Sequence, residues 1–276
     1  MCDENTGRAA LGDSVPRQPQ QALADFEKAY PGLSESMVDV PTADGTCDAF
    51  FVHPTEGKHP GVIFWPDAIA LREAKMAMAR RLASSGYSVL VVNQYYRAAR
   101  TPLGIKFSDF ADPDARARLM PLMGGVREPG GIERDAQAFA AYLDGQPSVD
   151  TARGIGTQGY CMGGALAFRT AAAVPDRVTA VATFHGGGLA TDAADSPHRL
   201  MAKTQAAFLI LPGQDDDKNE PGAVDRLRET AAAAGRPAEI EVYKANHGWC
   251  VPDAPSYDKA EADRAWERLL ALYAEL

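Results

Sequence analysis

The sequence predicts an α/β fold, with a mostly parallel central sheet flanked by helices on both faces. From about residue 61 onward, short apolar runs alternate with helical patterns, and this alternation is typical of parallel sheets. The run over 61–65 is continuously apolar, as in a strand that is buried on both faces. The chain has 276 residues, of which 46% are hydrophobic, and this suits one large domain with a sizeable core.

Composition narrows the class of protein. The net charge is −9 without a long basic run, so we expect no nucleic-acid and no membrane partner. The sequence shows neither a signal-peptide pattern nor an apolar run of about 18 residues. Cys2, Cys47, Cys161 and Cys250 form no C-x-x-C pair. We therefore expect neither a disulfide scaffold nor a metal site, and a cytoplasmic location.

The first half of the chain predicts an arm followed by the start of the domain. Residues 1–20 are polar and aperiodic, which indicates a flexible N-terminal arm, so the single domain is expected over 21–276. The expected elements are a helix over 21–30, a hairpin of strands over 36–40 and 46–53, a strand over 61–65, a helix over 71–85 and a strand over 88–93. Residues 98–130 look irregular, and such a segment is either a lid, a wall of the substrate site or a mobile surface insert.

The second half predicts further strand and helix pairs. They are a helix over 131–143, a strand over 153–157, a helix over 162–173, strands over 178–184 and 206–211, a helix over 221–235, a strand over 239–243 and a helix over 257–276. In parallel sheets, functional loops lie beyond the carboxyl ends of the strands. Six reactive or charged residues fall at such ends, namely Asp67, Arg97, Cys161, His185, Asp215 and His247. We expect them to converge.

The stretch Gly159-Tyr-Cys161-Met-Gly163 is the most informative motif. It has the spacing of a nucleophile elbow, with cysteine where serine is usual, between a predicted strand and a predicted helix. The tight turn needs small neighbours, and the free N–H groups of the following helix favour a thiolate. The N–H of Met162 would serve as an oxyanion donor. The alternative is a glycine-rich turn with a buried structural cysteine.

A cysteine nucleophile needs a base and an acid downstream. His247 follows a late strand and is the best candidate for the base, whereas His185 either lines the cleft or lies hydrogen-bonded beneath the elbow. Asp215, Asp216 and Asp217 all follow the strand over 206–211, and Asp215 is our choice for the acid because it is nearest the strand. The order nucleophile, acid, histidine is that of an α/β-hydrolase.

Other strand ends supply candidates for binding or supporting the substrate. The N–H of Ala68 is the natural second oxyanion donor, and Asp67 beside it either forms a turn or holds the thiol neutral. Arg97 either clamps a substrate carboxylate or forms a structural ion pair. Tyr95 and Trp249 are the remaining candidates near the site.

Together these motifs resemble the dienelactone hydrolase family over most of the chain, from about Asp44 to the end. The matching pieces are Trp65-Pro66-Asp67, Tyr95-Tyr96-Arg97, Gly159-Tyr-Cys161-Met-Gly-Gly164, Gly213-Gln-Asp215 and Asn246-His247-Gly248. Members of that family hydrolyse enol lactones with a Cys-His-Asp triad, without metal or cofactor. The resemblance therefore implies Cys161 as nucleophile, His247 as base and Asp215 as acid.

The resemblance also concerns charged residues around the triad. It implies that Asp67 takes the place of a family glutamate that exchanges a proton with the resting thiol. Arg97 matches one carboxylate-binding arginine of the family. The second such arginine is absent, since residues 249–252 read Trp-Cys-Val-Pro.

The sequence thus predicts a carboxylic ester hydrolase that acts on a small lactone or ester. The alternatives are a general carboxylesterase or thioesterase with a different substrate, and a non-catalytic protein with a redox-reactive thiol. A small-molecule partner is expected, on a monomer or a weak homo-oligomer.

Overall fold

The computed structural model describes residues 23, 30–107, 112–126 and 128–276. The expected N-terminal arm over residues 1–20 lies outside the described residues, as does nearly all of the helix expected over 21–30.

The core of the protein is an eight-stranded sheet of order β1-β2-β4-β3-β5-β6-β7-β8. The strands are β1 (Leu33–Thr42), β2 (Gly45–Pro54), β3 (Gly61–Trp65), β4 (Ser88–Val92), β5 (Ile155–Tyr160), β6 (Val178–Phe184), β7 (Ala207–Leu211) and β8 (Ala238–Ile240). β1 and β2 form an antiparallel hairpin, β2 runs antiparallel to β4, and all pairs from β4 to β8 are parallel. The predicted fold class is confirmed.

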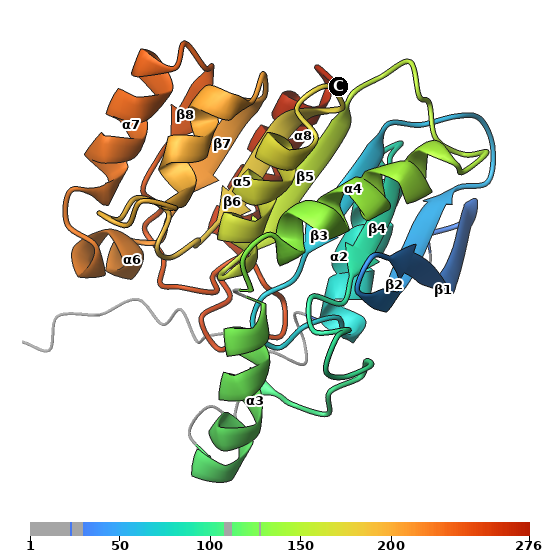
Figure 1. Ribbon diagram of the computed structural model, residues 1–276, viewed down its shortest axis with the longest axis horizontal. Coiled ribbons are helices and arrows are strands. Elements are labelled where there is room, and N and C mark those ends of the chain that lie inside the picture. The colour runs from blue at the N-terminus through green and yellow to red at the C-terminus, as the bar shows by residue number, and fades with distance from the viewer. Residues whose placement is uncertain (1–22, 24–29, 108–111, 127) are drawn as a thin grey trace, which may run out of the picture.

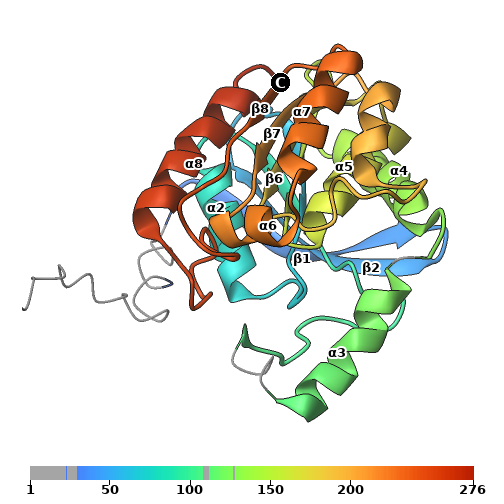
Figure 2. The same ribbon diagram turned by 90° about the vertical axis from the view of Figure 1, so that its left-hand side faces the viewer.

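Helices cover both faces of the sheet (Figures 1 and 2). They are α2 (Glu73–Ala83), α3 (Pro113–Gly125), α4 (Gly131–Asp144), α5 (Gly163–Ala173), the 3₁₀ helix η2 (Pro197–Lys203), α6 (Gln214–Asn219), α7 (Ala223–Ala233) and α8 (Lys259–Tyr273). α4, α5 and α7 pack on one face and α2 and α8 on the other. Among the helices within the described ranges, none is long and apolar enough to cross a membrane.

Two helices depart from the sequence prediction. The segment over 98–130 was expected to be irregular, but residues 113–125 form α3, whose first turn is capped by the Asp112 side chain. In both views α3 projects beyond the sheet edge at which α6 lies. The short helix α6 occupies a stretch that was expected to be a loop. Pro121 and two glycines lower the helix propensity of the segment that forms α3. Three adjacent aspartates lower it in the segment that forms α6.

Two glycines set the geometry of the turn between β5 and α5. A Cβ atom on Gly159 would lie 1.9 Å from the carbonyl oxygen of Gly163, and one on Gly163 would lie 2.5 Å from the carbonyl oxygen of Trp65. Both neighbours are backbone atoms and cannot rotate away. The start of α5 therefore contacts the end of β3 directly, and only glycine allows this approach.

This contact makes a testable prediction. Gly163→Ala should lower the free energy of unfolding by at least about 2 kcal/mol, because the added methyl group must push β3 and α5 apart. Gly124→Ala is the matched control, since a Cβ there meets nothing within 4 Å and alanine favours the helix. Urea unfolding measures both, and equal stability of the two variants would contradict the account.

Candidate active site

Beyond the carboxyl ends of three strands, a residue has a left-handed backbone conformation. Ala70 (φ 65°), Cys161 (φ 56°) and His185 (φ 42°) are the non-glycine residues with positive φ in the part of the chain that the structure describes. They follow β3, β5 and β6, which are adjacent in the sheet. Such conformations are costly and cluster at functional sites. The backbone therefore marks the carboxyl ends of these three strands as the candidate site.

Cys161 and His247 face each other at this edge. The cysteine is half-buried, and its thiol lies close enough to the His247 ring to raise the pKa of that ring. On its other side, His247 Nδ1 lies 2.7 Å from Asp216 Oδ1. The structure thus brings a thiol, an imidazole and a carboxylate together, with a hydrogen bond between the imidazole and the carboxylate.

The carboxylate on the imidazole belongs to Asp216, so the choice of Asp215 is corrected. Because α6 begins at Gln214, successive side chains rotate about the helix, and Asp216 faces the His247 ring. Asp216 Oδ2 also accepts a hydrogen bond from the Gly213 N–H at 2.8 Å. Asp215 instead accepts the backbone N–H of His247 at 2.7 Å. Both carboxylates hold His247, one at its ring and the other at its backbone.

The charge state of His247 follows from these contacts. Burial alone lowers its pKa, but the hydrogen-bonded Asp216 carboxylate and the neighbouring Cys161 sulfur outweigh burial and raise the pKa to about 10. The imidazole is therefore protonated at neutral pH. An unfolded histidine titrates near ~6.5, so this interaction stabilises the fold fully below that pH and is lost as pH rises through about 10.

The loop after β3 carries Ala68, whose N–H is the expected oxyanion donor. Neither the Ala68 N–H nor the Met162 N–H donates to any other described residue. The Tyr95 hydroxyl donates to the Ala68 carbonyl at 2.9 Å, and the Gln94 amide donates to the Asp67 carbonyl at 2.7 Å. Gln94 and Tyr95 follow β4, and their two hydrogen bonds hold the loop that follows β3. Tyr95 therefore positions this loop through the Ala68 carbonyl.

Asp67 contacts two cations and its own loop, whereas the resemblance implies that it exchanges a proton with the thiol. It is 3% exposed and forms ion pairs with Arg72 and Lys75, each at 2.8 Å. Burial raises its pKa, but Lys75 and Arg72 outweigh burial and hold the pKa below its usual range. Its oxygens also accept the Ile69 N–H at 3.0 Å. The two cations stabilise the charged form of the Asp67 carboxylate. Its contacts anchor the loop that carries Ala68.

Sequence reasoning missed Arg72 and Lys75 as the partners of Asp67. The Lys75 side chain is fully buried, and its Nζ lies 4.4 Å from the centre of the Tyr160 ring. Tyr160 is the residue that precedes Cys161 in the sequence. The clue in the sequence is a lysine on the apolar side of α2, between Ala74 and Met76. A buried lysine needs a carboxylate, and Asp67 is the one within reach.

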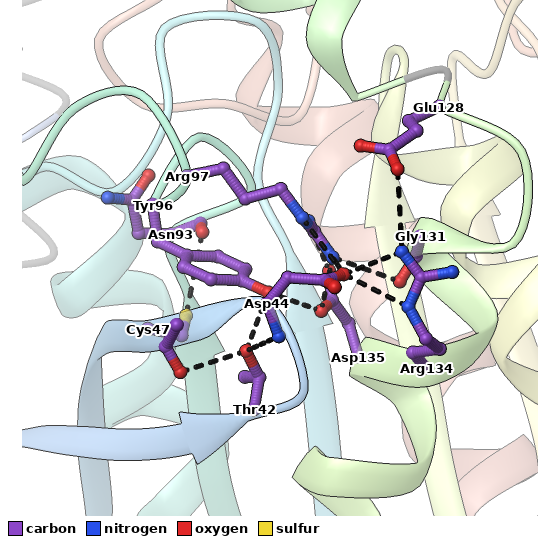
Figure 3. A network of polar contacts seen from close by, with 11 residues as sticks. Thr42, Asp44, Cys47, Asn93, Tyr96, Arg97, Glu128, Gly131, Arg134 and Asp135 are labelled. Atoms are coloured by element: carbon purple, nitrogen blue, oxygen red, sulfur yellow. Dashed lines mark hydrogen bonds and ion pairs between the residues drawn. The ribbon is translucent and has the colours of Figure 1, made fainter.

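Arg97 does not reach the site. Figure 3 shows its guanidinium between Asp44 and Asp135, at 2.6 and 2.8 Å. Asp135 is 1% exposed and also accepts the Tyr96 hydroxyl at 2.7 Å. Arg134 binds Asp44 from the other side at 2.7 Å. The structural ion pair is therefore the correct alternative for Arg97, and the carboxylate clamp is wrong.

His185 and Trp249 support the site from below. His185 is 1% exposed, and its ring packs edge-on against His247 with 4.7 Å between centroids. Neither of its ring nitrogens has a hydrogen-bond partner among the described residues, so the hydrogen-bonded alternative is wrong. Burial, followed by the neighbouring His247, holds its pKa well below the usual value. Trp249 is fully buried against Tyr243, so it packs in the core and does not line a cleft.

The family model of the dienelactone hydrolase family matches residues 47–276 of this chain. The chain belongs to the dienelactone hydrolase family. It is a hydrolase of that family, with an α/β-hydrolase fold.

Individual relatives agree with this assignment. A Methylorubrum extorquens protein provisionally named a carboxymethylenebutenolidase is 28% identical over 269 residues, which cover 94% of this chain and 87% of the relative. A Rhodococcus opacus carboxymethylenebutenolidase is 29% identical over 202 residues, covering 66% and 76%. The crystal structure of a Klebsiella pneumoniae protein provisionally named a dienelactone hydrolase superposes with a TM-score of 0.75 at 22% identity, covering 88% and 99%. This last likeness concerns the fold.

The position of Arg97 in this dienelactone hydrolase family member predicts an effect on stability. Arg97→Ala leaves the buried Asp135 without its cation, which should cost about 3 kcal/mol of unfolding free energy. Arg100→Ala is the control, because its partner Asp39 is exposed and the pair is on the surface. Urea unfolding measures both variants. A raised KM with unchanged stability in Arg97→Ala would contradict the structural role.

The two aspartates on His247 predict unequal losses. Asp216→Asn should lower kcat by about 10³–10⁴-fold, because an amide cannot hold the imidazolium in place. It should also lower the pKa of His247 from about 10, which NMR titration reports. Asp215→Asn keeps an acceptor for the backbone N–H and should cost about tenfold or less. Equal losses of kcat in the two variants would contradict the assignment of Asp216. A larger loss in Asp215→Asn would make Asp215 the acid.

Proposed function

We propose that this protein hydrolyses a carboxylic ester or lactone through Cys161, with His247 as the base and Asp216 as the acid. The observation that carries the proposal is the His247 ring, which lies next to the Cys161 thiol and is hydrogen-bonded to Asp216, beside a nucleophile held at φ 56°. An elbow cysteine beside an imidazolium favours the thiolate, which is the attacking form of cysteine.

In the first step, the Cys161 thiolate attacks the carbonyl carbon of the substrate. The negative charge moves to the carbonyl oxygen, where the N–H groups of Ala68 and Met162 stabilise it. When the tetrahedral intermediate collapses, the bond to the alkoxy oxygen breaks. The protonated His247 gives its proton to that oxygen, and the acyl group remains on Cys161 as a thioester.

In the second step, water replaces the alcohol. His247, now neutral, removes a proton from the water as its oxygen attacks the thioester carbonyl. The carbon–sulfur bond then breaks, which releases the carboxylic acid and restores the thiolate next to the imidazolium. Asp216 holds the imidazole in one orientation through both steps.

The lactone itself is a narrower proposal. The Rhodococcus opacus relative is named a carboxymethylenebutenolidase, which favours an enol lactone. A second candidate is a general ester, because Arg97 is bound to Asp44 and Asp135 and is not available to a substrate carboxylate. A purely redox role for the thiol does not account for an imidazole held between Cys161 and a carboxylate.

Turnover of a small panel tests the proposal. We expect dienelactone or p-nitrophenyl acetate to be hydrolysed by the wild type, and kcat to fall by at least about 10³-fold in Cys161→Ala. Cys250→Ala is the matched control, since Cys250 is buried and burial raises its pKa, so its thiol is not reactive. Turnover that survives Cys161→Ala, or disappears equally in Cys250→Ala, would sink the proposal.

A further inference from the structure

A cavity of about 510 Å³ begins beside the elbow, at Met162. Its walls come from the end of α3, the start of α4, the outer side of α5 and the loop that follows β6. Figure 1 shows α5 beside α4. This volume suits a small-molecule ligand. The cavity therefore lies where one arm of a substrate held at Cys161 would extend.

One wall of this cavity is apolar. Met123 and Val126 from the end of α3 line the cavity, together with Ile132 of α4 and Leu166 of α5. Val126, Ile132 and Leu166 are at most 6% exposed and belong to the main core. The wall is therefore rigidly backed, and burial of an apolar group against it is favourable by about 25 cal/mol per Å².

The charged side chains that line the cavity already form ion pairs within the protein. Among the lining residues the cation is Arg169, which pairs with Glu133 at 3.1 Å and with Asp195 at 2.9 Å. Glu128 is a third lining carboxylate, and its partner Arg134 at 3.5 Å is not a lining residue. An anionic substrate group would meet three carboxylates, and would compete with two of them for the guanidinium.

We infer that this cavity binds an uncharged, largely apolar arm of the ester, and that it discriminates against a substrate carboxylate. The inference rests on the proposed function, because it places the scissile carbonyl at Cys161. Glu133 and Asp195 are the specificity-determining residues, because they occupy Arg169. Met123 limits the length of the arm from the α3 side.

Two ester series test the inference, since either arm of an ester can occupy the cavity. The first comprises p-nitrophenyl acetate, p-nitrophenyl hexanoate and the p-nitrophenyl monoester of adipic acid. The second comprises ethyl acetate, hexyl acetate and 6-acetoxyhexanoate. In one series we expect kcat/KM to rise about tenfold or more from the short to the long neutral ester. In that series the carboxylate analogue should be about tenfold or more worse than the neutral ester.

Matched variants separate the cavity from its surroundings. Met123→Trp fills the cavity and should reduce the ratio of long to short ester by about tenfold, whereas Met120→Trp, on the same helix and 58% exposed, should keep the wild-type ratio. The double variant Glu133→Gln with Asp195→Asn releases Arg169. It should raise relative turnover of the carboxylate ester about tenfold, and should do so at high salt, where general repulsion by the net charge of −9 is screened.

The outcomes distinguish this inference from the proposed function. If esters are hydrolysed in a Cys161-dependent way but neither series shows the length and charge preferences, the inference fails and the proposed function stands. An unchanged ratio in Met123→Trp, or no gain in the double variant, would likewise overturn the inference. If turnover does not depend on Cys161, the proposed function fails and the inference fails with it.

Discussion

The close backbone contact between the elbow and the end of β3 is the constraint on which the rest of the site depends. Gly163 meets the Trp65 carbonyl so closely that no side chain fits between them. β3 and β5 are also hydrogen-bonded neighbours, with Trp65 opposite Gly159. The loop after β3 is therefore held at the start of α5, and the N–H groups of Ala68 and Met162 lie on the same edge as the Cys161 thiol. Geometry that would be strained in isolation is set by the packing of a rigid sheet.

The charged residues near the site are largely committed to one another. Asp67 is bound by Arg72 and Lys75, and it fixes the loop that presents Ala68. Arg97 is bound by Asp44 and Asp135, and it ties the β1–β2 turn to α4. Both residues stand at positions where the family resemblance implied contact with the thiol or the substrate. Their contacts are instead within the protein, so electrostatic recognition of a substrate carboxylate has no free cation at these positions. Under the proposed function, selectivity comes from the shape and apolar wall of the site.

Much of this architecture could be predicted from the sequence, because the decisive patterns are local. The strand over 61–65 is a continuous apolar run, the strand over 178–184 is mostly apolar, and the structure gives both the predicted bounds. The elbow is readable because its glycines and cysteine are adjacent. The acid could not be resolved, because the choice between Asp215 and Asp216 depends on where α6 begins, and one residue turns a helical side chain by about 100°. The partners of Arg97 could not be found either, since Asp135 is distant in sequence and the pairing is a property of the fold.

The central claim is that Cys161 becomes acylated during turnover. The most direct test is acid quenching of the wild-type protein during reaction with an activated ester, followed by intact-mass measurement and peptide mapping. The account predicts one acyl group on the peptide that contains Cys161, and none on that peptide in Cys161→Ala. Asp216→Asn should change how fast the adduct forms and disappears, but not its position. Turnover without an adduct, or an adduct on any other residue, would contradict the account.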